Sequence, residues 1–235
     1  MAWTVLSKRI KRQIADAVKH YKSSRTDFDR LARELQMNLV EDASLVPFIH
    51  SSKYRTKEPD HLRHKLKRYA IAATKKHRPF TITSKSLFTR VPDLAGVRIL
   101  HLHTKQLAEL HPAIMSVLKK YNYTITEGPI AHTWDIESRA FFKSIKIQPR
   151  SRESLYTSVH YVLKPADRPD LRVELQVRTL MEEVWGEVSH SVNYPHETKS
   201  LSCKEQLRVL ARFTSGCTRL VDSIFQSHHE HRARH

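Results

Sequence analysis

The chain has 235 residues, of which 40% are hydrophobic, which is enough apolar material for one good-sized folded domain. Its 41 lysines and arginines against 24 acidic residues give a formal net charge of +17, which indicates a polyanionic partner such as nucleotide phosphates, RNA or an anionic surface. Two cysteines exclude a disulfide framework, and four scattered glycines exclude a Walker A loop or a dinucleotide-binding glycine fingerprint. Any bound phosphates must therefore be held by side chains.

The N-terminal sequence MAWTVLSKRIKRQ lacks the apolar run of a signal peptide, and no stretch approaches the length of a membrane span. We therefore expect a cytoplasmic protein with no membrane partner.

The first part of the chain predicts two amphipathic helices. Apolar residues recur at helical spacing over residues 6–21 and again over residues 28–39, and Thr26 is a suitable N-cap for the second helix. We assign residues 1–45 to an N-terminal helical extension.

The next segments alternate between strand and helix patterns. Residues 48–57 shift toward a period of two, Pro59 opens a helix, residues 95–102 form a short apolar strand, and residues 107–118 return to helical spacing. This order indicates an α/β domain in which helices flank a central sheet.

A long, poorly patterned connection then leads to two strands, SVHYVLK and RVELQVR, whose turn-rich linker PADRPD predicts a hairpin. Thr179 and Glu182 have the spacing of a capping box and begin a helix. We place the main domain at residues 46–197 and a C-terminal helix with a basic tail at residues 198–235. The apolar stripe of that last helix could pack on the core or support oligomers.

Basic side chains gather at one junction between a strand and a helix. Arg55 and Lys57 share a strand face, and His61, Lys65 and Arg68 share a helix face. Together they suit a triphosphate, although each face alone is also typical of an ordinary solvated surface.

Two acids could form a Mg²⁺ site. Asp93 directly precedes the strand that carries Arg98, and Glu174 lies on the polar face of a later strand. If the two strands are neighbours, the carboxylates could hold Mg²⁺ together with substrate phosphates. The alternative is a turn aspartate and an unrelated surface glutamate.

Further polar residues follow on the last strands and on the helix after them. Tyr156 could stack on a base and His160 could donate to phosphate, but both could also be structural. Glu183, Glu187 and His190 share one helix face, which either lines a cleft or forms a solvated stripe.

Four blocks occur in one order along the chain: YRTKEPDHLRHKLKR, DLAGVRI, YTSVHYV and VELQVRTLMEEVWGEVSHSVNY. With these four blocks in this order, the chain resembles the RelA/SpoT-type alarmone synthetase family, in particular its stand-alone small members. The resemblance implies a mixed central β-sheet flanked by helices, a nucleotidyltransferase-like synthetase fold, with helical N- and C-terminal extensions.

The resemblance also implies a reaction, the transfer of the β,γ-pyrophosphate of ATP to the ribose 3′-hydroxyl of GDP or GTP. Arg55 and Arg98 would sandwich the adenine, while Lys57, Lys65 and Arg68 would contact the ATP phosphates. His61, on the same helix face, stands where we would expect a small hydroxyl residue in the family.

The metal and acceptor residues follow from the same resemblance. Asp93 and Glu174 would hold Mg²⁺, with Glu174 also close to the attacking hydroxyl. Tyr156 would stack on the acceptor guanine, and Gln176 and His160 would support the site. Such a transfer depends mostly on positioning and on neutralising charge.

Glu183 carries a further hypothesis about the acceptor. In the family's fold its position faces the acceptor base, where a carboxylate can accept hydrogen bonds from N1–H and the 2-amino group of guanine. Adenine offers no matching pair of donors on that edge, so we expect guanine to be preferred.

The chain also departs from the family pattern. Leu155 stands where many members have glycine, and Thr157 where many have arginine, and the connection between Arg98 and Tyr156 is long enough to suggest an insertion near the acceptor. No His-Asp doublet, the mark of the family's hydrolase domain, occurs in the chain. We therefore expect synthesis without hydrolysis.

Two alternatives remain open. A toxin-like relative would modify the 3′ end of tRNA, for which the segment KSIKIQPRSR supplies four cations: Lys143, Lys146, Arg150 and Arg152. The same cations suit the 5′ phosphates of an acceptor nucleotide. The other alternative is a non-catalytic nucleotide- or RNA-binding module. A homo-oligomer and an antitoxin or regulatory protein are further partners to test.

Overall fold

The computed structural model describes residues 6–151, 155–194 and 197–234. Its centre is one six-stranded sheet with the order β1-β2-β6-β5-β3-β4. The pairs β2–β6 and β3–β4 are parallel and the other pairs are antiparallel, so the sheet is mixed. The strands are β1 (Ser51–Thr56), β2 (Ala95–His101), β3 (Tyr123–Thr133), β4 (Gln148–Ser151), β5 (Ser158–Pro165) and β6 (Val173–Thr179).

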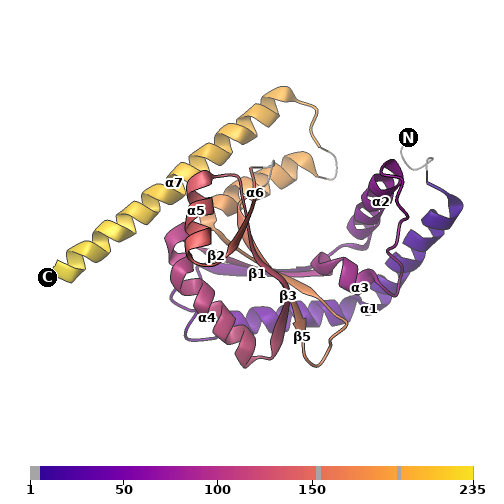
Figure 1. The fold of residues 1–235 in the computed structure, drawn as a ribbon, viewed down its shortest axis with the longest axis horizontal. Coiled ribbons are helices and arrows are strands. Elements are labelled where there is room, and N and C mark those ends of the chain that lie inside the picture. The colour runs from indigo at the N-terminus through magenta and orange to yellow at the C-terminus, as the bar shows by residue number, and fades with distance from the viewer. Residues whose placement is uncertain (1–5, 152–154, 195–196, 235) are drawn as a thin grey trace.

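Helices flank this sheet, as the predicted fold class requires (Figure 1). They are α1 (Lys8–Val40), α2 (Pro59–Lys75), α3 (Leu87–Arg90), α4 (Leu107–Lys120), α5 (Ile136–Ser144), α6 (Leu180–Asn193) and α7 (Leu201–Arg234). Short 3-10 turns at Pro92–Leu94 and Thr104–Gln106 precede β2 and α4. None of the helices among the described residues combines the length and apolar composition that a membrane span needs.

The prediction of two N-terminal helices is wrong, because α1 is a single helix of 33 residues. Its apolar stripe stays in phase across the expected break, since Tyr21 and Phe28 are seven residues apart and lie on the same face. Thr26 is therefore an interior helical residue and not an N-cap. No glycine or proline interrupts the segment, so packing against the sheet determines the outcome.

The hydrophobic core lies between α1, α4 and one face of the sheet. Alternate residues of β2 and β6, including Val97, Ile99, Leu175 and Val177, are almost fully buried and join the apolar stripe of α1 in one cluster. The intervening residues point to the opposite face because side chains alternate along a strand. That opposite face carries the polar residues of interest.

The poorly patterned connection contains two sheet strands, β3 and β4, that sequence reasoning missed. β3 is 11 residues long and pairs with β5, but the pairing shifts register around Glu127. Gly128 has a positive φ of 93°, and a Cβ there would lie 2.4 Å from the carbonyl oxygen of His160. The irregularity breaks the period of two, so the sequence pattern does not reveal the strand.

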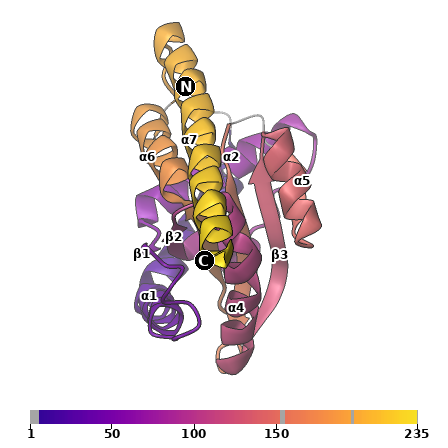
Figure 2. The same cartoon turned by 90° about the vertical axis from the view of Figure 1, so that its left-hand side faces the viewer.

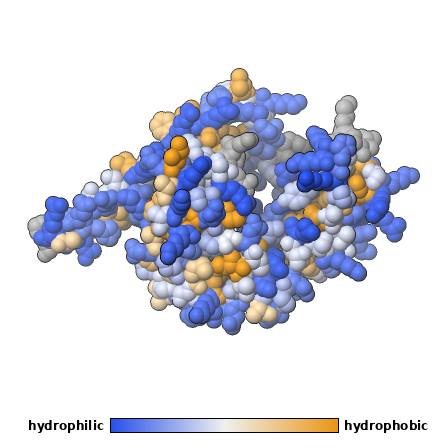
Figure 3. All heavy atoms as spheres, in the orientation of Figure 1, coloured by the Kyte–Doolittle hydropathy of each residue, from blue (hydrophilic) through white to orange (hydrophobic). Residues whose placement is uncertain are grey.

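The C-terminal helix docks through polar side chains. Figure 2 shows α7 between α6 and α5, and its buried positions are Ala211, Thr214, Thr218 and Asp222. Several members of its apolar face stay exposed, among them Phe213 (68%), Leu220 (63%) and Ile224 (57%). Apolar side chains appear along this helix in Figure 3. The helix thus packs on the domain, with Leu207, Leu210 and Val221 half-buried, while the rest of its apolar stripe stays exposed.

Candidate active site

The pairing of β2 with β6 brings the two candidate metal ligands to one place. The register sets Gly96 opposite Glu174 and Arg98 opposite Gln176, so the two strands are neighbours as the metal-site hypothesis requires. Asp93 lies in the turn directly before β2. The local sequence explains each strand, but only the parallel pairing joins them.

These side chains line a cavity of about 420 Å³ on the sheet face opposite the core. Its walls come from β1, β2, β6 and α6, together with Tyr156 just before β5. The lining residues are Lys53, Tyr54, Arg55, Asp93, Gly96, Val97, Arg98, Tyr156, Glu174, Gln176, Arg178, Gly186, Glu187 and His190. A volume of this size is typical of small-molecule sites in proteins.

Two lysines hold the carboxylate of Asp93. The Nζ of Lys65 is 2.7 Å from Oδ1, and the Nζ of Lys57 is 3.0 Å from Oδ2. Burial alone would raise the pKa of Asp93, but the two ammonium groups outweigh it and hold that pKa below its usual value. Burial lowers the pKa of Lys57, whereas Asp93 keeps the pKa of Lys65 above its usual value despite burial. Asp93 is therefore ionised at neutral pH.

Glu174 belongs to a chain of hydrogen bonds. Its Oε1 is 2.9 Å from Nδ1 of His160, and its Oε2 accepts from Nε2 of Gln176 at 2.7 Å. Nε2 of His160 is in turn 3.0 Å from the hydroxyl of Tyr156. Burial would raise the pKa of Glu174, but its hydrogen bond with His160 and the charge of the imidazole lower it overall. Burial raises the pKa of Tyr156.

Arg98 is held by the two acids of α6. Its Nη1 lies 2.7 Å from Oε1 of both Glu183 and Glu187. Glu183, only 7% exposed, also forms an ion pair with Arg178, and its Oε1 is 3.5 Å from Nζ of Lys53. Of this helix face, Glu187 and His190 line the cavity, whereas Glu183 is not among the lining residues and lies against Arg98 and Arg178.

Two further predicted residues line the cavity, and two others lie near Tyr194. Arg55 and His190 line it, and the ring of His190 stacks on that of Tyr194 at a centroid distance of 4.7 Å. His61 meets Tyr194 edge to face at 4.6 Å. Arg68 is close enough to influence Tyr194, whose pKa burial raises and this guanidinium lowers. Of the basic junction predicted from the sequence, Arg55 thus lines the cavity, while His61 and Arg68 lie near Tyr194, which is not among the lining residues.

The cations proposed for the acceptor are placed differently. Lys143 near the end of α5, Lys146 in the following turn and Arg150 on β4 are not among the described residues that line the cavity. Arg152 lies outside the described residues. Their acceptor-binding role stays a prediction.

Among the cavity residues that sequence reasoning missed are Lys53 on β1, Arg178 on β6 and Gly186 on α6. Arg178 continues the alternation of Glu174 and Gln176, and Lys53 shares the parity of Arg55, so the period of two could have found both. Gly186 interrupts a helix without ending it, which is a weaker signal.

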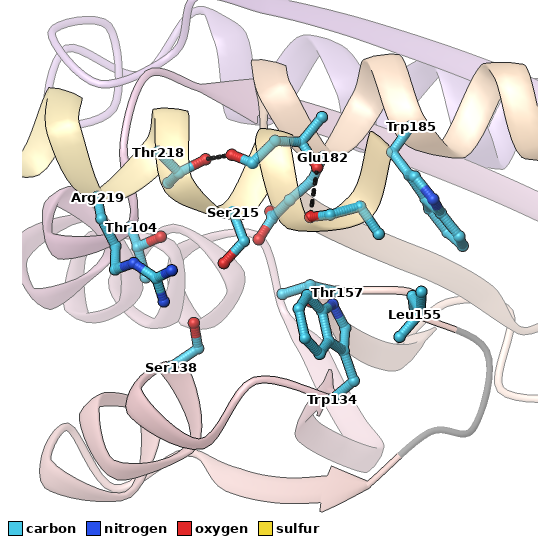
Figure 4. Close-up of a pocket in the computed structure, with 12 residues that line it drawn as sticks. Thr104, Trp134, Ser138, Leu155, Thr157, Glu182, Trp185, Ser215, Thr218 and Arg219 are labelled. Atoms are coloured by element: carbon cyan, nitrogen blue, oxygen red, sulfur yellow. Dashed lines mark hydrogen bonds between the residues drawn. The ribbon is translucent and has the colours of Figure 1, made fainter. Parts of the chain in front are cut away.

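A second, smaller pocket lies between α5, α6 and α7 (Figure 4). Trp134, Trp185 and Arg219 surround it, and Glu182 closes one side. Its volume of about 20 Å³ is close to that of one water molecule. None of the predicted site residues lines it, so we place the candidate active site in the larger cavity.

The chemistry of the larger cavity fits Mg²⁺ delivered with a nucleotide. Asp93 and Glu174 offer ionised oxygen ligands on adjoining elements, and the charge of Asp93 acts to raise the pKa of Glu174. Among the described residues no group of three or more His, Cys, Asp or Glu side chains could hold a metal by itself. Two carboxylates completed by phosphates and water match the way Mg²⁺ is usually bound.

Comparison with known proteins identifies the family of this chain. The family model described as the region found in RelA / SpoT proteins matches residues 54–199, which is more than half of the chain. No curated protein is similar enough in sequence to count as a match.

Solved structures share the fold. The small alarmone synthetase 1 from Bacillus subtilis bound to its product pppGpp is 18% identical, with a TM-score of 0.60 over 89% of this chain and 98% of that chain. The same enzyme bound to AMPCPP is 17% identical, with a TM-score of 0.56 over 86% and 95%. A GTP pyrophosphokinase family protein from Streptococcus pneumoniae is 18% identical, with a TM-score of 0.57 over 98% and 99%.

Proposed function

Because the chain belongs to the RelA/SpoT family, we propose that it transfers the β,γ-pyrophosphate of ATP to the ribose 3′-hydroxyl of GDP or GTP. The observation that carries the proposal is the cavity itself. It joins two ionised carboxylates, Asp93 and Glu174, with the cations that a triphosphate needs. The solved relatives with pppGpp or AMPCPP bound support nucleotides of both kinds as substrates.

The ATP end of the site is the basic junction. Arg55 and Arg98 face the cavity from neighbouring strands, and a guanidinium plane can stack on an adenine ring. Lys57, Lys65 and Arg68 supply positive charge for the phosphates. Phosphates that reach this junction compete with Asp93 for the two lysines.

The acceptor end is the wall formed by Tyr156 and Glu174, with His160 hydrogen-bonded to both. The acceptor's 3′-oxygen attacks the β-phosphorus of ATP, the bond from that phosphorus to the α–β bridging oxygen breaks, and AMP leaves. We assign the acceptance of the hydroxyl proton to Glu174, and the hydrogen bonds from His160 and Gln176 that orient its carboxylate support this role. Bound Mg²⁺, held by Asp93 and Glu174, would supply neutralisation of the phosphate charge.

The first test offers γ-labelled ATP and Mg²⁺ to the purified protein with GDP, GTP, ADP or bulk tRNA in separate reactions. We expect label on the guanine nucleotides, and loss of at least about a hundredfold in rate for Glu174→Gln, which removes a metal ligand and the base. Chelation of Mg²⁺ should abolish transfer as well.

Other outcomes separate the alternatives. Label on tRNA alone would replace the proposed acceptor with an RNA end. Absence of transfer in every reaction, with nucleotide binding intact, would indicate the non-catalytic module. Undiminished transfer by Glu174→Gln would contradict the assigned role of this carboxylate.

A further inference from the structure

Arg178 is a buried arginine that the mechanism above does not use. It lies at the end of β6, is only 3% exposed, and forms an ion pair with Glu183. Its guanidinium carbon is 5.8 Å from the ring centroid of Tyr156, within the range of a cation–π contact. Arg178 therefore touches both residues that are assigned to the acceptor base.

The helix opposite is shaped to admit this guanidinium. A Cβ at Gly186 would lie 2.4 Å from Nη1 of Arg178 and 3.1 Å from its Cζ, too close for any side chain without displacement. Glycine inside a helix costs about 1 kcal/mol relative to alanine. The chain accepts that cost at the point where α6 covers Arg178.

Stability alone does not account for the arrangement. Among the described residues the buried Nε of Arg178 has no hydrogen-bond partner, and a buried polar atom without a partner is unfavourable. Unpaired buried polar atoms and glycines inside helices, which both cost stability, occur in natural proteins mainly at functional sites. Both Arg178 and Tyr156 line the larger cavity, the candidate active site.

We infer that Arg178 is a positioning residue for the acceptor nucleotide, holding the ring of Tyr156 and the carboxylate of Glu183 in place for a guanine base. The inference rests on the proposed function, because it takes this wall as the place of the acceptor. Arg178 acts through its two neighbours, with Gly186 leaving the room it needs.

The test measures binding by calorimetry, with GDP as the acceptor probe and AMPCPP as the ATP analogue. Arg178→Lys keeps the charge but loses the planar guanidinium, and Gly186→Ala leaves Arg178 present but displaces it. Both should weaken GDP binding by about tenfold and change AMPCPP binding by less than about twofold, since the lost contacts lie on the acceptor wall.

Gly216→Ala is the matched control, because Gly216 lies in α7 and a Cβ placed there meets no other part of the described chain within 4 Å, its sequence neighbours and the backbone of its own helix apart. It should leave both affinities unchanged. Thermal unfolding of all variants identifies any that fail to fold, and Gly186→Ala keeps the test decisive if Arg178→Lys does not fold.

The outcomes for the two proposals differ. The inference would be overturned if both folded variants bound GDP with wild-type affinity, or if they lost GDP and AMPCPP binding equally. It would also be overturned if the wild type did not bind GDP. If the wild type binds both nucleotides but transfers no pyrophosphate, the proposed function fails while a selective loss of GDP binding still supports Arg178.

Discussion

Glu183 lies between two arginines, and this position links the two halves of the site. Arg98, predicted to stack on adenine, and Arg178, beside Tyr156, both pair with its carboxylate. Each carboxylate oxygen has two lone pairs and can accept two hydrogen bonds. The two ion pairs with arginine therefore leave capacity for a further donor from a base. A single side chain can therefore influence both nucleotides.

Glu183→Ala should relax the preference for a guanine acceptor. We expect the ratio of GDP to ADP transfer rates to fall at least about tenfold, the loss expected for one hydrogen bond to a charged group. The Michaelis constant for ATP should also rise, because Arg98 loses one of its two carboxylate partners. Steady-state kinetics with both acceptors measure the two effects.

Glu187→Ala is the comparison variant for this prediction. It removes the other carboxylate on Arg98, from a more exposed position, and should leave the GDP-to-ADP ratio near that of the wild type. An unchanged ratio in Glu183→Ala would contradict the assignment of base recognition to this residue.

At the scale of elements, the start of α6 places the acids of the site. The capping box predicted from the sequence is present: the hydroxyl of Thr179 accepts from the backbone N–H of Glu182, and Glu182 accepts from that of Thr179. Burial beside α7 raises the pKa of Glu182 to about 7. The cap that orients α6 thus contains an unusual carboxyl group.

That pKa predicts a pH dependence of stability. An acid whose pKa is raised on folding binds more protons folded than unfolded, so stability is lost as pH rises from 4.5 toward about 7. Glutamine keeps the cap without this penalty. Glu182→Gln should therefore melt at least about 2–4 °C higher than the wild type at pH 8, the shift for roughly 1 kcal/mol in a domain of this size.

The advantage of Glu182→Gln should shrink below pH 4.5, where the carboxyl group is protonated in both states. Glu109→Gln, a change at an exposed glutamate of α4, controls for the loss of one negative charge. If the difference in melting temperature between Glu182→Gln and the wild type did not vary with pH, the raised pKa assigned to Glu182 would be contradicted.

Polar contacts help to attach the last helix, beside the stacking of Phe225 on His103. Asp222 lies 2.6 Å from Nδ1 of His103 and accepts from the backbone N–H of Lys105 at 2.8 Å. Arg219 pairs with Asp135, the N-cap residue of α5, at 2.9 Å. These contacts determine which face of α7 is turned to the domain.

Across the whole molecule, a charge of +17 makes self-repulsion a significant term. Hydrophilic side chains cover most of the surface seen in Figure 3. The exposed ion pairs offset little of this repulsion, since each is worth about 0–1 kcal/mol. The buried pairs on Asp93 and Glu183 are screened less by salt.

Salt should therefore stabilise the protein. Raising NaCl from about 50 to 500 mM shortens the Debye length from about 14 to 4 Å and should raise the melting temperature by about 2–4 °C. Thermal unfolding in NaCl, which avoids the phosphate and sulfate anions that could bind the site, gives the measurement. A melting temperature that falls with salt would show that surface ion pairs outweigh the repulsion.

Local patterns were enough for much of the fold. The alternation in β2 and β6, the turn between β5 and β6, the proline that opens α2 and the capping box of α6 all depend on residues close in sequence. The four ordered blocks were enough for the family, which the family model matching residues 54–199 confirms.

The remaining features depend on contacts between distant residues. Continuity of α1 follows from the phase of its stripe against the sheet. β3 shifts register where Gly128 passes close to β5, and Ser215 of α7 donates to Asp135 at the start of α5. Likewise, residue types indicated a basic junction and two acids, but the pairing of β2 with β6 joined them. The partners of Glu183 and Arg178 come from separate elements, so only the tertiary structure could bring them together.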